Sequence, residues 1–256
     1  GMGIKAKNLK VTDDAIRTII QDYTAESGVR GLKKQMNTLC RYAAVKLVKG
    51  EQKSITVNPK RLREFLDQKP IHHESILEEK QPGVVTGLAW TSAGGEILFI
   101  EAMFTKGSGK IQVTGQLGDV MKESVQIAVS LVKSMYPESA AMWKENDLHI
   151  HVPAGAVPKD GPSAGITLTT ALASLVTGKA VSPQYAMTGE VSLRGGVMPI
   201  GGLPEKLMAA QRAGVSKVFI PYENVEDLED VADEVKEKLE IIPVKKVKDV
   251  LKRLGL

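Results

Sequence analysis

Cysteine and aromatic residues are scarce in this chain of 256 residues. The single cysteine, Cys40, cannot form an internal disulfide, and its apolar-periodic surroundings are typical of a helix core. The chain therefore suits a reducing compartment. Aromatic residues make up only 4% of the sequence, which argues against a stacking surface for single-stranded nucleic acid.

Long apolar runs are missing as well. No run approaches the roughly 18 residues that would span a bilayer, and the N-terminus lacks the charged and apolar regions of a signal peptide. We therefore expect a cytosolic protein. The opening Gly1-Met2-Gly3 places a residue before an apparent start methionine, which suggests an artificial boundary and a fragment of a longer protein.

The length of the chain favours two domains. Residues 12–70 carry helical signals: a capped helix near 12–23, a second helix near 32–47, a short strand at 54–57 and a last helix near 59–67. The stretch from Lys69 to Gly83 holds two prolines and a charged run, which is typical of a linker. We thus expect a small helical domain at 1–70, a linker at 71–83 and a second domain at 84–256.

The second domain alternates strand and helix patterns. Strands at 84–90, 96–105 and 110–114 are expected to form a meander, and further strands are expected at 148–152, 185–193 and 217–220. Helices are expected near 120–132, 162–176 and 203–213, followed by an acidic helix, a short strand and a basic helix. The fold class is therefore α+β, with a small helical domain followed by a mixed α/β domain.

A serine motif stands at the start of one expected helix. Gly161-Pro162-Ser163-Ala164-Gly165 matches G-x-S-x-G, which presents a nucleophilic serine on a tight turn. The match alone is weak, because serine is also a common structural helix cap. The α/β-hydrolase order of serine, acid and histidine fails, since all four histidines precede Ser163. A different base is required for catalysis.

His149 and His151 offer two further interpretations. One of them, followed by Asp160 and Ser163, would give the order of histidine, aspartate and serine found in the chymotrypsin triad, but all of these residues would be crowded into fifteen positions. A metal pair is conceivable, yet no third ligand stands at a telling spacing. Because the two histidines alternate with aliphatic residues on one strand, we prefer a structural or site-lining role for them.

Lys206 is the candidate base. Pro204 suits the first position of a helix, so Lys206 falls in the first turn, where the helix dipole disfavours a positive charge and should lower the pKa of the amine. A lysine acts as a base only when its pKa approaches neutrality. The alternative is an ordinary solvated lysine beside Glu205. One mechanism would explain both the serine without a downstream histidine and the unusually placed cation.

Three motifs together closely resemble the protease domain of bacterial Lon, an ATP-dependent Ser-Lys protease. They are residues 158–165 (PKDGPSAG), 188–195 (TGEVSLRG) and 201–206 (GGLPEK). The resemblance implies Ser163 as nucleophile and Lys206 as general base, with Thr188 orienting the amine. It also implies supporting roles for four residues near the site: Asp160, Glu101, His149 and His151. The family usually has Lys where this chain has Pro204, a change that does not touch the dyad.

The resemblance extends into the first domain. Residues 27–32 (SGVRGL) resemble the sensor-2 segment of the small AAA+ helical subdomain of Lon, which implies that Arg30 contacts nucleotide phosphates in the parent protein. No G-x-x-x-x-G-K-[ST] occurs, so we expect no cofactor in this fragment, whereas the parent would use ATP and magnesium. The family also implies unfolded protein substrates, missing ATPase and N-terminal parts as partners, and a homohexamer.

Two other classes of function compete with proteolysis. The chain could be a non-catalytic ring-assembly module in which the serine turn and Lys206 are structural. It could also bind DNA, on the excess of Lys and Arg and the basic C-terminal helix. The net charge of +4 is spread along the chain, and most such charge runs are solvated faces, so nucleic acid is the weaker interpretation.

Overall fold

The computed structural model describes residues 3–24, 29–91, 94–154 and 159–256. The chain folds as two compact units, each with its own core. The smaller unit contains the chain up to His73, and the larger one contains Glu74–Thr91 and Gly95–Leu256. The α+β class expected from the sequence is confirmed.

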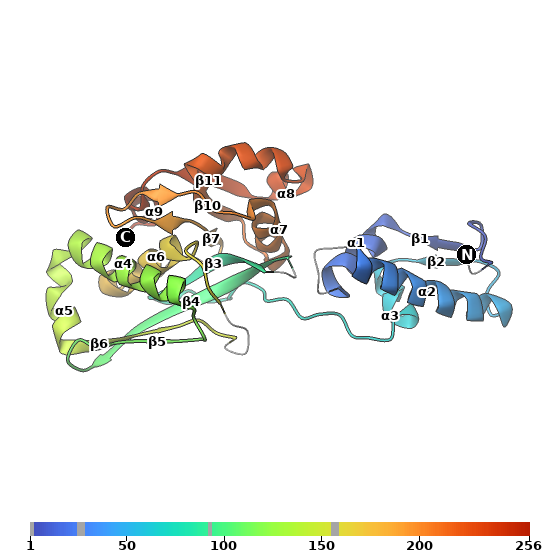
Figure 1. Cartoon of the computed structure of the whole chain (residues 1–256), viewed down its shortest axis with the longest axis horizontal. Coiled ribbons are helices and arrows are strands. Elements are labelled where there is room, and N and C mark those ends of the chain that lie inside the picture. Colours follow the sequence, from blue (N-terminus) through green and yellow to red (C-terminus); the bar gives the residue numbers. More distant parts are fainter. Residues whose placement is uncertain (1–2, 25–28, 92–93, 155–158) are drawn as a thin grey trace. The chain divides into compact units, whose positions relative to one another are not determined.

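In its described residues the smaller unit combines α-helices with a two-stranded parallel sheet (Figure 1). Its elements are β1 (Leu9–Val11), α1 (Asp13–Asp22), α2 (Arg30–Val48), β2 (Ile55–Val57), η1 (Pro59–Arg61) and α3 (Leu62–Phe65). Thr12 begins α1, because its hydroxyl accepts a hydrogen bond from the backbone N–H of Ala15 at 3.1 Å. Strand β1 has no counterpart in the sequence prediction, since three residues are too few to show a period.

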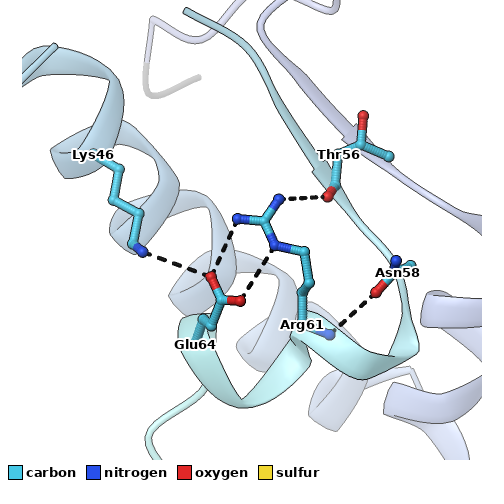
Figure 2. A network of polar contacts seen from close by, with 5 residues as sticks. All are labelled: Lys46, Thr56, Asn58, Arg61 and Glu64. Atoms are coloured by element: carbon cyan, nitrogen blue, oxygen red, sulfur yellow. Dashed lines mark hydrogen bonds and ion pairs between the residues drawn. The ribbon is translucent and has the colours of Figure 1, made fainter. Parts of the chain in front are cut away.

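Arg61 ties the last turn of this unit to its strand and to α2 (Figure 2). Its guanidinium contacts the Glu64 carboxylate through two nitrogens, at 3.3 and 3.1 Å, and donates to the Thr56 carbonyl at 2.9 Å. Lys46 reaches the same carboxylate at 3.7 Å. Hydrogen bonding from Arg61 holds the pKa of Glu64 below its usual value. A single arginine therefore fixes how α3 lies against β2.

The larger unit is built on a mixed sheet of seven strands in the order β11-β10-β7-β3-β4-β6-β5. The strands are β3 (Val84–Thr91), β4 (Gly94–Lys106), β5 (Ile111–Thr114), β6 (Asn146–His151), β7 (Tyr185–Met187), β10 (Lys217–Pro221) and β11 (Glu240–Val244). A separate antiparallel pair is formed by β8 (Glu190–Val191) and β9 (Val197–Met198).

Helices cover both faces of this sheet (Figure 1). They are α4 (Asp119–Met135), η2 (Pro137–Ser139), α5 (Ala140–Glu145), α6 (Gly165–Thr177), α7 (Leu203–Ala213), η3 (Tyr222–Asp230), α8 (Asp233–Lys238) and α9 (Val247–Arg253). One core contains α4, α6 and α9, and the other contains α7 and α8. Strand β10 serves both, because Phe219 packs into the first core and its neighbours Val218 and Ile220 into the second.

The meander expected for the first three strands is wrong. Strand β6 lies between β4 and β5, antiparallel to β4 and parallel to β5. This insertion depends on a pairing between residues 35 or more positions apart in the chain, such as Thr114 with His151. A local strand pattern cannot show such a pairing, since it predicts a strand without its neighbours.

Residues 71–83 contain no helix or strand, but several of their backbone groups are bonded. The N–H of Ile71 donates to the Asp22 carbonyl at 2.5 Å within the smaller unit. Within the larger unit the N–H of Ile76 donates to the Ala213 carbonyl at 3.1 Å, and that of Gly83 to the Ser174 hydroxyl at 3.0 Å.

Candidate active site

One pocket of about 350 Å³ in the larger unit brings Ser163 and Lys206 together. Its wall is mostly apolar and comes from the end of β3, the start of α4, the turn before α6 and the loop before α7. Lys159 and Asp160 are the other titratable residues that line it. The remaining lining residues are Leu88, Ala89, Trp90, Thr91, Leu98, Met121, Gly161, Pro162, Ala164, Pro199, Ile200 and Gly201.

Ser163 lies in a tight turn two residues before α6. The N–H of Gly165 donates to the Pro162 carbonyl at 3.1 Å, which closes this turn, so α6 begins at Gly165 and not near Pro162 as the sequence predicts. Helix α6 follows as a largely buried element, with residues 165–174 all inside the core. The serine is therefore presented at the mouth of the pocket by a rigid support.

Close packing fixes the start of α6 from the other side. A side chain at Gly165 would place its Cβ 3.0 Å from the backbone nitrogen of Val191, and one at Gly189 would lie 2.9 Å from the Val197 side chain. Such distances are too short for any residue larger than glycine without a shift of its neighbours. The two glycines thus allow the Ser163 turn to sit directly against the β8–β9 hairpin.

Lys206 is buried although it is a lysine: only 2% of its surface is exposed. It stands in the first turn of α7, and its backbone N–H donates to the Gly202 carbonyl at 3.0 Å. Burial lowers the pKa of its amine from 10.5 to about 8. The direction agrees with the expectation from the sequence, and the cause that the structure shows is desolvation by packing.

Two details of this helix differ from the sequence prediction. Leu203 is the first residue of α7, so Pro204 occupies the second position, where proline is also tolerated because the N–H has no partner inside the helix. Gly202 precedes it in the left-handed region with φ of 70°, and a Cβ there would lie 2.9 Å from the Trp90 ring. Trp90 therefore lies directly beneath the start of the helix.

The segment Thr188–Gly189 links the two candidate catalytic residues. The Lys206 amine donates to the Thr188 hydroxyl at 3.2 Å, and the next residue, Gly189, donates its N–H to the Ser163 carbonyl at 2.9 Å. The Gly189 carbonyl accepts from Ile166 at 3.0 Å. Thr188 is itself fully buried. A two-residue segment therefore fixes both the amine and the serine turn.

Asp160 joins the serine turn to α4. Its carboxylate accepts from the N–H groups of Met121, at 3.0 Å, and Gly161, at 2.8 Å, and these bonds hold the pKa of Asp160 below its usual value. A Cβ at Gly118, the cap of α4, would lie 2.2 Å from the Asp160 carboxyl carbon. Asp160 thus caps α4 from outside the helix.

Lys159 is a site residue that the sequence prediction did not single out. Its amine donates to the carbonyls of Gly115, at 3.0 Å, and Ala154, at 2.8 Å, and burial lowers its pKa. The available signal was its place beside Asp160 in the motif 158–165, and most lysines in a sequence are solvated.

Glu101, His149 and His151 do not line the Ser163 pocket. They line a second hollow of about 420 Å³ with Met103 and Gln81 among its neighbours. As expected, the two histidines share one face of β6, while Leu148 and Ile150 are buried on the other.

Thr114 stands between the two histidines. Its hydroxyl lies 2.8 Å from His149 Nε2 and 2.6 Å from His151 Nδ1. A hydroxyl donates only one proton, so at least one of these ring nitrogens must donate to it.

Arg30 is the first residue of α2 in the smaller unit and is exposed. Its motif neighbours Ser27 and Gly28, and Pro158 of the serine motif, lie outside the described residues. Among the residues that the structure describes, no group of three His, Cys, Asp or Glu side chains is placed to hold a metal ion. Within the same residues, no helix combines the length and apolarity needed to cross a membrane.

Comparison with known proteins identifies this arrangement. The chain matches the model of the Lon protease (S16) C-terminal proteolytic domain over residues 56–255 and that of the Lon protease AAA+ ATPase lid domain over residues 1–55. The domain at residues 56–255 is therefore of the serine peptidase class, and it is preceded by a lid domain. The chain belongs to the Lon protease family.

Curated relatives agree with the family models. The chain is 57% identical to Lon protease of Clostridium beijerinckii over 99% of its length, 51% identical to that of Methanosarcina barkeri over 98%, and 49% identical to that of Methanosphaera stadtmanae over 99%. These alignments cover 32%, 32% and 31% of the respective relatives. The chain thus spans about a third of the length of the curated relatives it matches.

Proposed function

We propose that this chain is the proteolytic part of an ATP-dependent protease that hydrolyses unfolded or damaged proteins with a dyad of Ser163 and Lys206. The observation that carries the proposal is the lysine amine itself. It is almost fully buried, its pKa is lowered to about 8, and it lines the same pocket as a serine held on a tight turn. An amine in this state supplies a free base near neutral pH.

In this mechanism the neutral Lys206 amine takes the proton of the Ser163 hydroxyl while Oγ attacks the carbonyl carbon of the scissile peptide bond. The resulting ammonium then gives its proton to the leaving amine as the peptide bond breaks. Water, deprotonated by the same lysine, attacks the acyl-enzyme and releases the second product. Thr188 keeps the amine oriented through its hydroxyl, which accepts from Lys206.

Backbone groups at the serine turn are available for the developing oxyanion. The N–H groups of Gly165 and Ile166 are bonded to Pro162 and Gly189, whereas within the described part of the chain no bond uses those of Ser163 and Ala164. Loss of one such donor typically costs about 2.7 to 4 kcal/mol of transition-state stabilisation in serine hydrolases. We assign the oxyanion site to these two groups.

Asp160 supports the site in this proposal by fixing the serine turn to α4. We assign Glu101, His149 and His151 to a supporting role at a distance, because they line a neighbouring hollow on β4 and β6.

We propose domain limits of 1–70 for the lid, 71–83 for the linker and 84–256 for the protease. The two compact units support a division in this region. In the parent protein, Arg30 would contact nucleotide phosphates, and ATP and magnesium would act in an ATPase part. We further propose a homohexamer in the cytosol, with unfolded proteins as substrates and the ATPase and N-terminal parts as partners.

Two substitutions test the dyad. Ser163→Ala and Lys206→Ala should each abolish hydrolysis of a small peptide and of an unfolded protein while the fold is kept, and a fluorophosphonate probe or a peptide boronate should react with the unchanged chain but not with Ser163→Ala. Peptidase activity that survives either substitution would remove the dyad. A chain that binds DNA and ignores both probes would favour the non-catalytic module instead.

A further inference from the structure

Asn224 in η3 has a buried amide side chain, and the mechanism above gives this residue no role. Only 3% of its surface is exposed. Its Oδ1 accepts from the N–H of Ile200 at 3.0 Å, and its Nδ2 donates to the carbonyl of the same residue at 2.8 Å. The second Nδ2 proton goes to the Asp227 carboxylate at 2.7 Å. Both backbone groups of one loop residue are therefore satisfied by one side chain.

Ile200 belongs to the loop that forms one wall of the Ser163 pocket. Pro199, Ile200 and Gly201 all line that pocket, and the loop leads through Gly202 into the first turn of α7. The paired bonds of Asn224 to the N–H and the carbonyl of Ile200 resemble those that a neighbouring β-strand would make. They fix the position of the Ile200 backbone, six residues before Lys206.

The opposite side of the loop is also constrained. Gly202 adopts φ of 70° directly over the Trp90 ring, so the loop is held by Trp90 at one end and by Asn224 at the other. The chain between Ile200 and α7 consists of two adjacent glycines, Gly201 and Gly202, and glycine backbones permit a wide range of conformations. Without the Asn224 bonds, this short glycine segment would no longer fix the pocket wall.

We propose that Asn224 is a positioning residue for the peptidase reaction, which holds the loop 199–202 and through it the pocket wall and the first turn of α7. The inference rests on the proposed dyad function. Asn224 does not touch the reacting atoms, and it acts through Ile200. The orientation of its amide is determined by its partners, because a carbonyl and a carboxylate both require a donor at Nδ2.

Asn224→Asp is the sharpest test, because the two side chains have the same shape. The side chain keeps the acceptor for the Ile200 N–H, but even if it is protonated beside Asp227 it has one proton for two acceptors, the Ile200 carbonyl and the Asp227 carboxylate. We expect kcat for a peptide substrate to fall about 10- to 100-fold, the effect of a displacement of about 1 Å at an active site. The matched control is Asn146→Asp, which is the same substitution at the surface and loses a bond to the Met142 carbonyl; its kcat should stay within about twofold.

Two further readouts separate positioning from a general loss of stability. A loosened loop admits water to the Lys206 amine and so raises its pKa. The rising limb of the plot of kcat/KM against pH should therefore move to higher pH in Asn224→Asp. Affinity for a peptide boronate should fall along with kcat, measured at a temperature where circular dichroism shows the variant folded. An unchanged kcat and an unmoved limb in a folded variant would overturn the proposal.

If Asn224→Asp does not fold, Asn224→Ser replaces it. That smaller, neutral side chain cannot satisfy both backbone groups of Ile200 as the amide does, and we expect a loss of kcat in the same direction. Full activity of a folded Asn224→Ser would then overturn the proposal. Failure of the proposed dyad is distinguished by the unchanged chain, which in that case would show neither Ser163-dependent hydrolysis nor boronate binding.

Discussion

The pKa of Lys206 makes a quantitative prediction for the pH dependence of peptide hydrolysis. Burial lowers this pKa from 10.5 to about 8, and only the neutral amine can take the proton of Ser163. With a pKa of about 8, about 9% of the amines are neutral at pH 7, about half at pH 8 and about 90% at pH 9. We therefore expect kcat/KM to rise about tenfold from pH 7 to pH 9 and then to level off.

An unperturbed lysine would behave differently. With a pKa of 10.5, the neutral fraction would rise about 100-fold over the same interval, and no plateau would appear below about pH 10.5. The assay is kcat/KM for a peptide with blocked termini between pH 6 and pH 10, since this ratio reports the titration of the free enzyme. A flat profile, or one that still climbs at pH 10, would refute the assignment of Lys206 as a buried base.

Lys159 supplies the control for this experiment, because it lines the same pocket and burial lowers its pKa too. Lys159→Arg keeps a cation that can reach the carbonyls of Gly115 and Ala154 but does not titrate in this range. The rise of kcat/KM with pH should stay at the same pH in this variant. If the rise disappears in Lys159→Arg, the titration belongs to Lys159.

Five further substitutions test the surroundings of the site and the lid. Thr188→Val removes the hydroxyl that accepts from Lys206, and we expect kcat to fall about tenfold, with Thr188→Ser restoring most of it. Lys206→Met should raise the unfolding free energy at pH 7 by up to about 3 kcal/mol, because the pKa of Lys206 is lowered from 10.5 to about 8 in the folded state. Between about pH 8 and 10.5 the unfolded chain binds the proton and the folded chain does not, so the original protein gains stability as pH rises. Urea titrations should therefore show the difference between the two proteins shrinking over this range. Glu64→Gln, whose side chain is 45% exposed, should cost the lid less than about 1 kcal/mol, measured by hydrogen exchange in α2 and α3, whereas Arg61→Ala also loses the Thr56 bond and should cost more.

The sequence predicts the elements of this protein well where they are long and periodic. Helix α7 is placed at the expected residues 203–213, and α1 starts after Thr12 as its capping pattern indicates. The expected strand at 185–193 divides into β7 and β8, because Thr188 and Gly189 turn away to contact Lys206 and Ser163. The division therefore depends on tertiary contacts, which a local pattern does not record.

The candidate site was predictable to a different degree at each residue. Ser163 stands in a recognisable motif, and Lys206 follows from the failure of histidine as a base together with the family resemblance. The roles of both residues stay predictions. Asn224 gives no signal at all, since its bonds to Ile200 join positions 24 residues apart and asparagine is an ordinary loop residue.

The cost of burying Lys206 and the packing of α7 have one origin. A cation with its pKa lowered to about 8 destabilises the fold by about 3 kcal/mol at neutral pH. The same helix buries Leu203 and Leu207 almost completely, and each such side chain contributes about 1.5 to 3 kcal/mol. The two leucines flank the lysine in the sequence, so we infer that the packing that excludes water from them also desolvates the amine. Because α7 packs against β3, we expect a variant that opens this packing to hydrate Lys206 and to weaken the support of the pocket at the same time.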